Sequence, residues 1–574
     1  MGAPTVTGNN ALLQAPHFPG MSLPSAAPEA ALIVPPVGEE RSALFRKVRR
    51  ARVGGRFWEA PFRGTTTPQV ILRPRNAEEA HGLCSEEQGD LLCVSAKATD
   101  EKDTGSAGSG NIDPWSILPR ARGLVAHGDD EWVALARIAG IPVRVLSNGP
   151  YGAVDDDEEA GLEKAARALC IPFPNPFGEG FLSPLEAIDL LAEWRRVIDA
   201  NRGAEGEAIV AACGMSWWKR QEIRRFLFVP GVKLQIVKQS SKALAIAERQ
   251  GGALAVWPSR VTPELIAEAA SRNIPLVRVE DGFVRSAGLG SNLVPPSSVI
   301  VDRQGIHFDP RSPSDLESIL SDTKFTTQQL ERARALRKAI VAAGIGKYGG
   351  RGRTASLPER ETLSGKRIVL VPGQVENDMS VLAGGGGLAS NLELLRRVRK
   401  LEPDAEIWWR PHPDVDAGHR VGAVPDNTAL KLADRIVRGA SMGELLDRVD
   451  AVHVLTSLTG FEALLRRLDV TCHGTPFYAG WGLTRDMGDK LERRQRRLAL
   501  DELVAGVLLL YPRYLDPVTG VPCPPEVLVA RITEGQMPNR QGWIGPIRRW
   551  QGRLTGRVRT SLGKRKMSHE ENTR

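Results

Sequence analysis

The sequence lacks the long apolar segments that membrane proteins and exported proteins need. No run approaches the roughly 20 consecutive apolar residues that a membrane-spanning helix requires. The N-terminus has no basic segment followed by an apolar core, which argues against a secretory signal peptide. We therefore expect a cytoplasmic protein that reaches a membrane only from its surface, at the cytoplasmic face.

Paired cysteines are also missing. None of the six cysteines forms a C-x-x-C pair, so the sequence suggests neither a zinc site nor a disulfide framework, and scattered thiols fit a reducing compartment. A glycine run at 384–387 precedes a predicted helix, but no G-K-[ST] follows, which excludes a Walker A loop. That run is consistent with an anion-holding turn or with a plain loop.

Positive charge is concentrated at the C-terminal end. Lys plus Arg number 76 and Asp plus Glu 68, so the net charge is +8. Beyond residue 545 the acids are Glu570 and Glu571 alone, against nine basic side chains: Arg548, Arg549, Arg553, Arg557, Arg559, Lys564, Arg565, Lys566 and Arg574. Such a tail favours peripheral contact with an anionic membrane surface, or it is a solvated, disordered end. No nucleic-acid-binding pattern accompanies it, so we expect no nucleic-acid partner.

With 574 residues, the chain is too long for one hydrophobic core. Composition and periodicity predict five regions: a disordered start (1–40), an N-terminal region (41–204), two β-α series (205–345 and 366–530) and a basic tail (531–574). Alternating strands and helices predict parallel sheets covered by helices, hence an α/β fold with two lobes around a cleft.

Local signals place several elements. Ser183-Pro184-Leu185-Glu186 predicts a capping box that opens a helix with an apolar stripe at Leu185, Ile188, Leu191, Trp194 and Ile198. In the first β-α series the predicted strands are 208–213, 234–237, 254–257 and 275–279, and the predicted helices 219–228, 242–250 and 263–272. In the second the predicted strands are 367–371, 406–409, 451–455 and 470–473, and the predicted helices 392–400 and 461–468.

Polar clusters follow these strands, at the edge where parallel sheets bind ligands. Glu280 and Asp281 end one strand, and an Asp placed there is either a base or nucleophile or an ordinary loop residue. His412 stands between two prolines that restrict the backbone, which suits a phosphate contact or a structural turn.

Two further clusters lie in the second series. Thr456 to Glu462 opens a helix with small hydroxyls that either cap it or bind phosphate, and Glu462 is placed to accept hydrogen bonds from a ribose. Gly474 to Gly482 sets aromatic residues among glycines, as a stacking wall or as a packed loop. Each cluster is weak alone, but four such clusters at strand ends together indicate an active site.

Together, four strings resemble the KpsC/LipA capsule polysaccharide family. They are Glu280-Asp281-Gly282-Phe283-Val284-Arg285-Ser286, Gly373-Gln374-Val375-Glu376, Pro411-His412-Pro413-Asp414-Val415 and Pro476-Phe477-Tyr478-Ala479-Gly480-Trp481-Gly482-Leu483-Thr484. Trp218-Lys219-Arg220 and Tyr511-Pro512-Arg513-Tyr514 match as well, so the resemblance covers about 205–530.

The resemblance implies a GT-B fold, with two Rossmann-like lobes, and a retaining β-Kdo transferase. Such an enzyme moves 3-deoxy-D-manno-oct-2-ulosonic acid (Kdo) from CMP-Kdo to a lipid-linked phosphatidylglycerol-Kdo acceptor in capsule biosynthesis, without a metal or other cofactor. The implied partners are the nucleotide sugar, the glycolipid acceptor and the capsule assembly machinery. The alternative is a non-catalytic export or assembly component with a degenerate transferase fold.

The resemblance also implies roles for individual residues. The implied catalytic residues are Asp281 as nucleophile or reacting carboxylate, Glu280 and His412. The implied nucleotide-binding residues are Gln374, Arg410, His412, Pro413, Ser457, Thr459, Gly460 and Glu462. The implied substrate-binding residues are Lys219, Arg220, Arg285, Ser286, Asp378, Tyr478 and Trp481.

Three departures limit this transfer. Arg410 stands where family members often carry Lys, which keeps the charge but changes its geometry. Asn377 follows Glu376 where an acid is expected. Larger members have two transferase modules, whereas the first 200 residues here contain none of the motifs. The segment from Ala126 to Gly152 faintly echoes the segment from His453 to Tyr478, as a degenerate first module or by coincidence.

Overall fold

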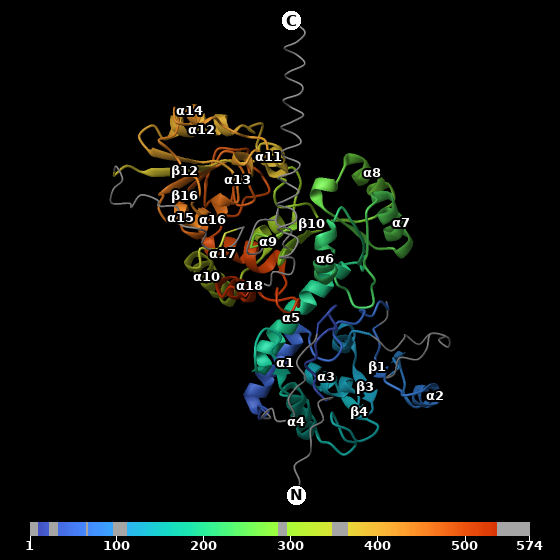
Figure 1. The fold of residues 1–574 in the computed structure, drawn as a ribbon. Coiled ribbons are helices and arrows are strands. Elements are labelled where there is room, and N and C mark those ends of the chain that lie inside the picture. Colours follow the sequence, from blue (N-terminus) through green and yellow to red (C-terminus); the bar gives the residue numbers. More distant parts are fainter. Residues whose placement is uncertain are drawn as a thin grey trace. The chain divides into compact units, whose positions relative to one another are not determined.

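The computed structural model describes residues 10–21, 33–64, 67–95, 112–284, 295–346 and 365–536. The chain divides into two compact units (Figure 1). The first unit comprises 1–210, 227–234 and 519–524, and the second comprises 211–226, 235–518 and 525–574. Each unit is described by itself.

The first unit is built on a four-stranded sheet with the order β2-β1-β3-β4, and every pair of neighbours is parallel. Its strands are β1 (Val70–Leu72), β2 (Leu91–Cys93), β3 (Gly123–Ala126) and β4 (Val143–Val145). Its helices are α1 (Gly38–Ala51), α2 (Ala77–Glu86), α3 (Glu131–Ala139), α4 (Glu158–Leu169) and α5 (Pro184–Arg202), and β5 (Phe173–Pro174) pairs with β6 (Phe181–Leu182) in a small hairpin. Residues 41–204 therefore contain an α/β sheet of their own.

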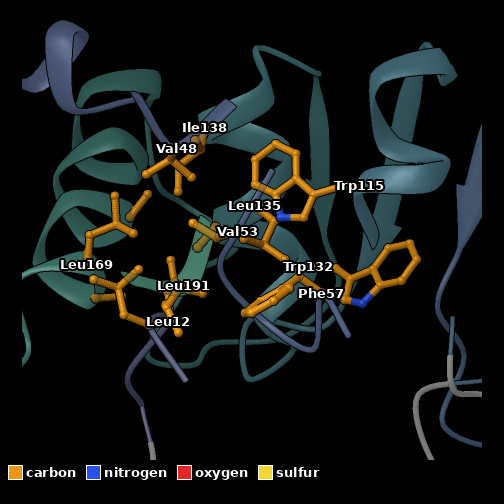
Figure 2. Packing of buried hydrophobic residues seen from close by; sticks show 14 of the residues in the cluster. Leu12, Val48, Val53, Phe57, Trp115, Trp132, Leu135, Ile138, Leu169 and Leu191 are labelled. Atoms are coloured by element: carbon orange, nitrogen blue, oxygen red, sulfur yellow. The ribbon is translucent and has the colours of Figure 1, made fainter. Parts of the chain in front are cut away.

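The core of this unit corrects the expectation that 1–40 is disordered. Leu12 is fully buried and packs in the same cluster as Leu169 and Leu191 (Figure 2). Phe18, which is 4% exposed, belongs to this cluster as well. These apolar side chains come from distant parts of the chain, so no local sequence pattern predicts their burial. Residues 1–9 and 22–32 of the predicted disordered start lie outside the described residues.

Helix α5 begins as its sequence predicts. Ser183 accepts a hydrogen bond from the backbone N–H of Glu186, and the Glu186 side chain accepts from the N–H of Ser183, which completes the capping box. Ile188, Leu191, Trp194 and Ile198 are buried. Leu185 is wrong as a member of the apolar stripe, because it lies in the first turn with 51% of its surface exposed.

The second unit contains two six-stranded sheets, of which the first has the order β18-β11-β10-β9-β7-β8. Its strands are β7 (Ile209–Cys213), β8 (Gln235–Val237), β9 (Ala253–Val256), β10 (Leu276–Asp281), β11 (Ser298–Asp302) and β18 (Pro512–Tyr514). The accompanying helices are α6 (Arg220–Phe226), α7 (Ser240–Gln250), α8 (Pro263–Ser271), α9 (Asp315–Asp322) and α10 (Thr327–Ala342).

This sheet differs from prediction at one edge. The pairs β7–β8 and β9–β10 are parallel, but β11 runs antiparallel to β10, and β18 runs antiparallel to β11. Residues 512–514 therefore belong to the first sheet rather than to the lobe predicted over 366–530. A strand of three residues is too short to carry an alternation that would reveal its partner.

The second sheet has the order β14-β13-β12-β15-β16-β17, and every pair of neighbouring strands is parallel. Its strands are β12 (Ile368–Pro372), β13 (Glu406–Arg410), β14 (Arg435–Ile436), β15 (Ala451–Val454), β16 (Asp469–Cys472) and β17 (Arg485–Asp486). Its helices are α11 (Met379–Gly384), α12 (Asn391–Leu401), α13 (Pro413–Asp416), α14 (Asp426–Ala429), α15 (Met442–Leu446) and α16 (Thr459–Leu465), and α17 (Leu500–Val504) and α18 (Pro525–Thr533) follow.

The order of this sheet creates a switch point. Strand β12 comes first in the chain, β13 adds on one side of it, and β15 adds on the other. The loops after β12 and β15 therefore leave in opposite directions, which opens a crevice at the carboxyl ends of the strands.

The α/β class with parallel sheets is confirmed. None of the helices in the described ranges has the length and apolar character needed to cross a bilayer.

Candidate active site

A cavity of about 400 Å³ lies at the switch point of the second sheet. Three neighbouring strands deliver polar side chains to it, because the loops after β12, β13 and β15 all open at the same edge. The lining residues are Gly344, Gly346, Pro372, Gly373, Gln374, Val375, Asp378, Ser380, Arg410, Pro411, His412, Pro413, Ser441, Met442, Gly443, Thr456, Ser457, Leu458, Thr459 and Glu462. Its size is in the range of small-molecule sites.

The loop after β12 is held by a reciprocal amide contact. Gln374 Nε2 donates to Thr456 Oγ1 at 3.0 Å, and the backbone N–H of Thr456 donates to Gln374 Oε1 at 2.9 Å. Gln374 thus joins the loops after β12 and β15 and fixes the width of the crevice. At Gly373 a Cβ atom would come within 2.8 Å of the Trp409 ring, so only glycine lets this loop pass.

Asn391, at the start of α12, supports this loop from beneath. Its Oδ1 accepts from the N–H of Gln374 at 2.9 Å, and its Nδ2 donates to the carbonyls of Gln374 and Gly422, both at 2.8 Å. Glu376 accepts from the N–H of Asn391 at 2.7 Å. The loop therefore holds its shape through polar groups buried below the cavity.

His412 caps the short helix α13, and this contact sets its tautomer. The backbone N–H of Asp414 donates to Nδ1 at 3.2 Å. Because Nδ1 accepts, the neutral ring carries its hydrogen on Nε2, which makes Nε2 a donor. Pro411 and Pro413 restrict the backbone on either side, so a His residue at this point is held in one orientation.

Arg410 brings positive charge to the same wall. Its Nη2 donates to the carbonyl of Ala440 at 2.8 Å. Burial lowers the pKa of this guanidinium, and the negative charge of Glu462 acts in the opposite direction. The cavity therefore contains a cation, Arg410, and a carboxylate, Glu462, that interact electrostatically.

The segment after β15 supplies hydroxyl groups. Ser457 Oγ donates to Thr459 Oγ1 at 3.1 Å and accepts from the N–H of Thr459 at 3.2 Å. Asp378 adds a carboxylate, whose Oδ1 accepts from the hydroxyl of Ser380 at 2.7 Å. Such a mixture of hydroxyls, carboxylates and one guanidinium suits a hydroxyl-rich ligand that carries an anionic group.

Gly460 does not line the cavity, but its lack of a side chain allows the segment after β15 to pack against Tyr478. A Cβ atom at Gly460 would lie 2.3 Å from the hydroxyl oxygen of Tyr478. Tyr478 itself is fully buried, and its hydroxyl donates to the carbonyl of Ser457. The close approach of α16 to this buried tyrosine is therefore what requires glycine at 460.

The aromatic wall predicted after β16 is wrong. Tyr478 and Trp481 are both 0% exposed, and the Trp481 indole N–H donates to the carbonyl of Phe477 at 2.9 Å. Neither ring offers a face to a sugar or base. Aromatic residues among glycines are here a packed loop, and the sequence alone left that alternative open.

The second polar cluster lies at the end of β10. Lys219 Nζ contacts Asp281 Oδ1 at 2.8 Å, and the same ammonium lies 3.7 Å from the centre of the Trp257 ring. The backbone N–H of Asp281 donates to Glu280 Oε1 at 2.9 Å. Asp281 is thus a partly buried carboxylate with a cation beside it.

The loop after Asp281 packs on the segments that follow β15 and β16. The ring of Phe283 lies 4.8 Å from Phe477 and 6.2 Å from Phe461, measured between ring centres. His307 adds a ring at 4.9 Å from Phe283. At Gly282 a Cβ atom would lie 2.2 Å from Ser298 Oγ, so the turn that places Phe283 requires glycine.

The described structure brings together most of the predicted nucleotide-binding residues. Gln374, Arg410, His412, Pro413, Ser457, Thr459 and Glu462 line the cavity, as does Asp378. Asp281, Glu280 and Lys219 are not part of that lining, so the proximity of Asp281 to His412 stays a prediction. Arg220 begins α6 directly after Lys219, and Arg285 and Ser286 lie outside the described residues.

Sequence reasoning missed one wall of the cavity. Ser441, Met442 and Gly443 open α15, and Gly344 and Gly346 come from the segment after α10. A signal was present, since Ser441 and Glu444 form a capping box of the S-x-x-E type. The glycine run at 384–387, by contrast, ends α11 and contributes nothing to the lining.

Comparison with known proteins identifies the family. The profile of the family described as "Capsule polysaccharide biosynthesis protein" matches residues 252–345 and 344–514. "Capsule polysaccharide modification protein LipA" from Neisseria meningitidis serogroup A is 40% identical over 346 residues, which are 60% of this chain and 47% of LipA. The chain belongs to this capsule polysaccharide biosynthesis family, that of KpsC and LipA.

Further members resemble part of the chain. "Lipopolysaccharide-processing protein LpsZ" from Rhizobium meliloti is 45% identical over 248 residues, which are 43% of this chain and 56% of LpsZ. The chain thus spans about half the length of the curated relatives it matches.

Two solved structures from Thermosulfurimonas dismutans KpsC also match. The "beta Kdo 2,7 transferase" is 36% identical and the match covers 57% of this chain and 99% of that one, with a TM-score of 0.46. The "beta Kdo 2,4 transferase" is 31% identical and the match covers 57% and 98%, with a TM-score of 0.49.

Proposed function

We propose that this protein is a glycosyltransferase, a β-Kdo transferase that uses CMP-Kdo as donor. The observation that carries the proposal is the convergence of Arg410, His412, Ser457 and Glu462 on one cavity at the switch point. Glu462 accepts from the ribose hydroxyls, and Arg410 and the Nε2–H of His412 donate to the CMP phosphate. The matched KpsC structures are named as β-Kdo transferases, which agrees with this assignment.

The proposed architecture is GT-B, with the two sheets of the second unit as its lobes and the donor in the cavity of the second. The reaction uses no metal, because the charge that develops on the leaving phosphate is met by donors from Arg410 and His412. Kdo lies on the side where the loop carrying Asp281 enters. Lys219 and Arg220 are the residues proposed to meet its carboxylate.

The proposed retention proceeds through two displacements at the anomeric carbon, C2 of Kdo, and this route needs a carboxylate close to that carbon. First, an oxygen of the Asp281 carboxylate attacks C2, the bond from C2 to the phosphate oxygen breaks, and CMP leaves with the bonding electrons. Then the acceptor hydroxyl attacks C2, its proton passes to Glu280, and the Asp281 carboxylate leaves. The ammonium of Lys219, 2.8 Å from Asp281 Oδ1, positions this carboxylate before the first step.

The acceptor is proposed to be a lipid-linked Kdo saccharide, and the place of work the cytoplasmic face of a membrane. The activity proposed here is that of the part of the chain that matches its relatives.

Release of CMP from CMP-Kdo by the purified full chain tests the proposal. We expect Asp281→Asn to lower the turnover rate on the order of 10³-fold or more, because an amide cannot form the covalent intermediate. Binding of CMP, measured by calorimetry, should persist in this variant. Lys219→Met should lower turnover less than Asp281→Asn does, since it removes the cation but leaves the carboxylate.

Two outcomes contradict the proposal. If Asp281→Asn turns over CMP-Kdo at close to the wild-type rate, Asp281 is not the nucleophile. Absence of CMP release and of CMP binding by the wild-type chain favours the alternative, a non-catalytic export or assembly component.

A further inference from the structure

A second cavity, of about 680 Å³, opens at the opposite edge of the same parallel sheet. Arg367 directly precedes β12, Asp469 begins β16, and Arg485 begins β17, so the cavity lies at the amino ends of strands whose carboxyl ends form the first cavity. The remaining lining residues are Glu402, Leu464, Arg467, Leu468, Val470, Thr471, Leu483, Ala499, Leu500 and Asp501. None of these residues has a part in the proposed transfer.

The carboxylates at this cavity are engaged, whereas two of its arginines are not. Asp469 pairs with Arg367 at 2.8 Å, and Asp501 pairs with Arg334 at 2.9 Å. Glu402 lies 3.3 Å from His453 Nε2. The side chains of Arg467 and Arg485 are exposed, and their guanidinium groups form no ion pair or hydrogen bond with any residue in the described ranges. Three arginines and three carboxylates line the cavity, and the guanidinium groups of Arg467 and Arg485 are the ones that remain available to an anion within the described ranges.

The backbone of Arg467 is strained in a way that the fold does not require of an arginine. Its φ is 62°, at the position after helix α16 where the chain turns out of the helix. The turn is closed by the N–H of Leu468, which donates to the carbonyl of Ala463 at 3.1 Å. Glycine is the usual residue there, because it adopts a positive φ without steric cost. Arg467 keeps this conformation and lines the same cavity as Arg485, which makes its guanidinium a candidate ligand-binding group.

The floor of the cavity is apolar. Leu464 is 5% exposed and Val470 is 3% exposed, and Leu468, Leu483 and Leu500 also contribute. Burial is the first cause that lowers the pKa of the nearby His453 to about 4, and the positive charges of Arg485 and Arg367 add to it. A cavity of this volume takes a ligand far larger than a free inorganic anion.

We propose that this cavity binds an acidic saccharide, through a carboxylate or phosphate group held by Arg467 and Arg485. Guanidinium groups meet either oxyanion with paired hydrogen bonds. The ring of the sugar then covers the apolar floor. The choice of a saccharide rests on the proposed function, whereas the anionic group follows from the two arginines alone. The site lies away from the transfer cavity and would hold the glycan acceptor or product on the second lobe.

Direct binding to the full chain tests this proposal. Calorimetric titrations would use free Kdo for the carboxylate, glucose 1-phosphate for the phosphate and glucose as the neutral control, all in the presence of saturating CMP. We expect saturable binding of at least one acid with a dissociation constant in the millimolar range or tighter, and none of glucose. Arg485→Ala should weaken that binding about tenfold, whereas Arg396→Ala, at an exposed arginine paired with Glu393 on α12, should not change it.

A second variant separates binding from structure. Arg467→Gly removes the guanidinium and relieves the positive φ, so we expect a higher melting temperature together with weaker binding of the acid. A higher melting temperature with unchanged binding would overturn the proposal, as would equal binding of glucose. These titrations involve no turnover, and CMP binding is measured separately. Binding of the acid therefore tests this cavity even if the chain proves not to be a transferase.

Discussion

At the scale of single residues, two contacts in the second unit involve ionisable side chains that are largely buried, where a charged form is energetically unfavourable. Lys219 has a side chain that is 8% exposed, and its ammonium is compensated by Asp281 and by the ring of Trp257. Removing either member of a partly buried pair leaves the other uncompensated, so a variant at 219 acts on Asp281. The spacing of 62 residues between them hides this relation from the sequence.

The second contact is a buried pair of histidines on neighbouring strands, His453 within β15 and His473 directly after β16. His453 Nδ1 lies 3.1 Å from His473 Nε2, and His453 Nε2 lies 3.3 Å from Glu402. Because the carboxylate accepts at Nε2, Nδ1 of His453 accepts from the Nε2–H of His473. Burial is the first cause that lowers the pKa of both rings to about 4, from a usual value of 6.5, and nearby positive charges add to it.

This pair predicts a dependence of stability on acid. The folded pKa lies below the unfolded one, so the unfolded chain binds protons first, and the free energy of unfolding falls as the pH drops from about 6.5 to about 4. The slope is at most about 1.4 kcal/mol per pH unit for each histidine. His473→Gln keeps a donor toward His453 and removes one titrating ring, so urea unfolding of the variant between these pH values should show roughly half the slope. An unchanged slope would assign the acid sensitivity to other groups.

At the scale of elements, the candidate site depends on loops that support one another across the sheet. Gln374 and Thr456 tie the loop after β12 to the loop after β15, and Tyr478 ties the latter to the loop after β16. Displacing one loop therefore moves cavity residues on another. Gly460 is the point at which α16 and Tyr478 come closest.

Gly460→Ala should break this arrangement. The new methyl group would lie 2.3 Å from the Tyr478 hydroxyl, so α16 must shift and carry Ser457 and Thr459 with it. We expect a loss of about 1–3 kcal/mol in the free energy of unfolding, and weaker CMP binding in calorimetry. Gly82→Ala is the control, because Gly82 lies within α2 with no atom within 4 Å of the added methyl group. That control should gain about 0.5–1 kcal/mol, and equal losses in both variants would refute the clash.

At the scale of the whole molecule, the two units are interleaved along the chain. Segments 227–234 and 519–524 belong to the first unit, although the predicted boundary at 204/205 assigned them to the transferase lobes. Within that unit the indole N–H of Trp194 donates to the carbonyl of Pro522 at 2.7 Å, and Val521 is 2% exposed in the core. The lobes predicted from sequence are therefore not separable by a single cut.

Truncation tests this interleaving. A chain of residues 205–536 lacks the core on which Phe228 and Val521 pack, and these apolar side chains then meet water. We expect poor solubility and a melting temperature several degrees below that of the full chain. Serine at both positions should restore part of the solubility without restoring the melting temperature. A truncated chain that is as soluble and stable as the full chain would show that the two returning segments contribute little.

The basic tail is a separate matter at this scale, since residues 537–574 lie outside the described structure. Its nine basic residues after 545 predict attraction to anionic lipid. Deleting 546–574 should reduce sedimentation with liposomes that contain an anionic phospholipid, more at low salt than at high salt, and leave transfer to a soluble acceptor intact. Equal sedimentation of both proteins would assign the membrane contact elsewhere.

Local chemistry by itself determined the elements and one side of the candidate site. These features depend on neighbours within a few residues, so the sequence predicts them. They are the capping box at Ser183, the strand ends before Gly373 and Pro411, and the small hydroxyls at Ser457 and Thr459. Only the tertiary structure decided what distance in the chain conceals: the return of β18 to the first sheet, the burial of Leu12, and the interior positions of Tyr478 and Trp481. The reason is physical, since burial and strand pairing are set by partners far along the chain, whereas caps and turns are set by hydrogen bonds between residues close in sequence.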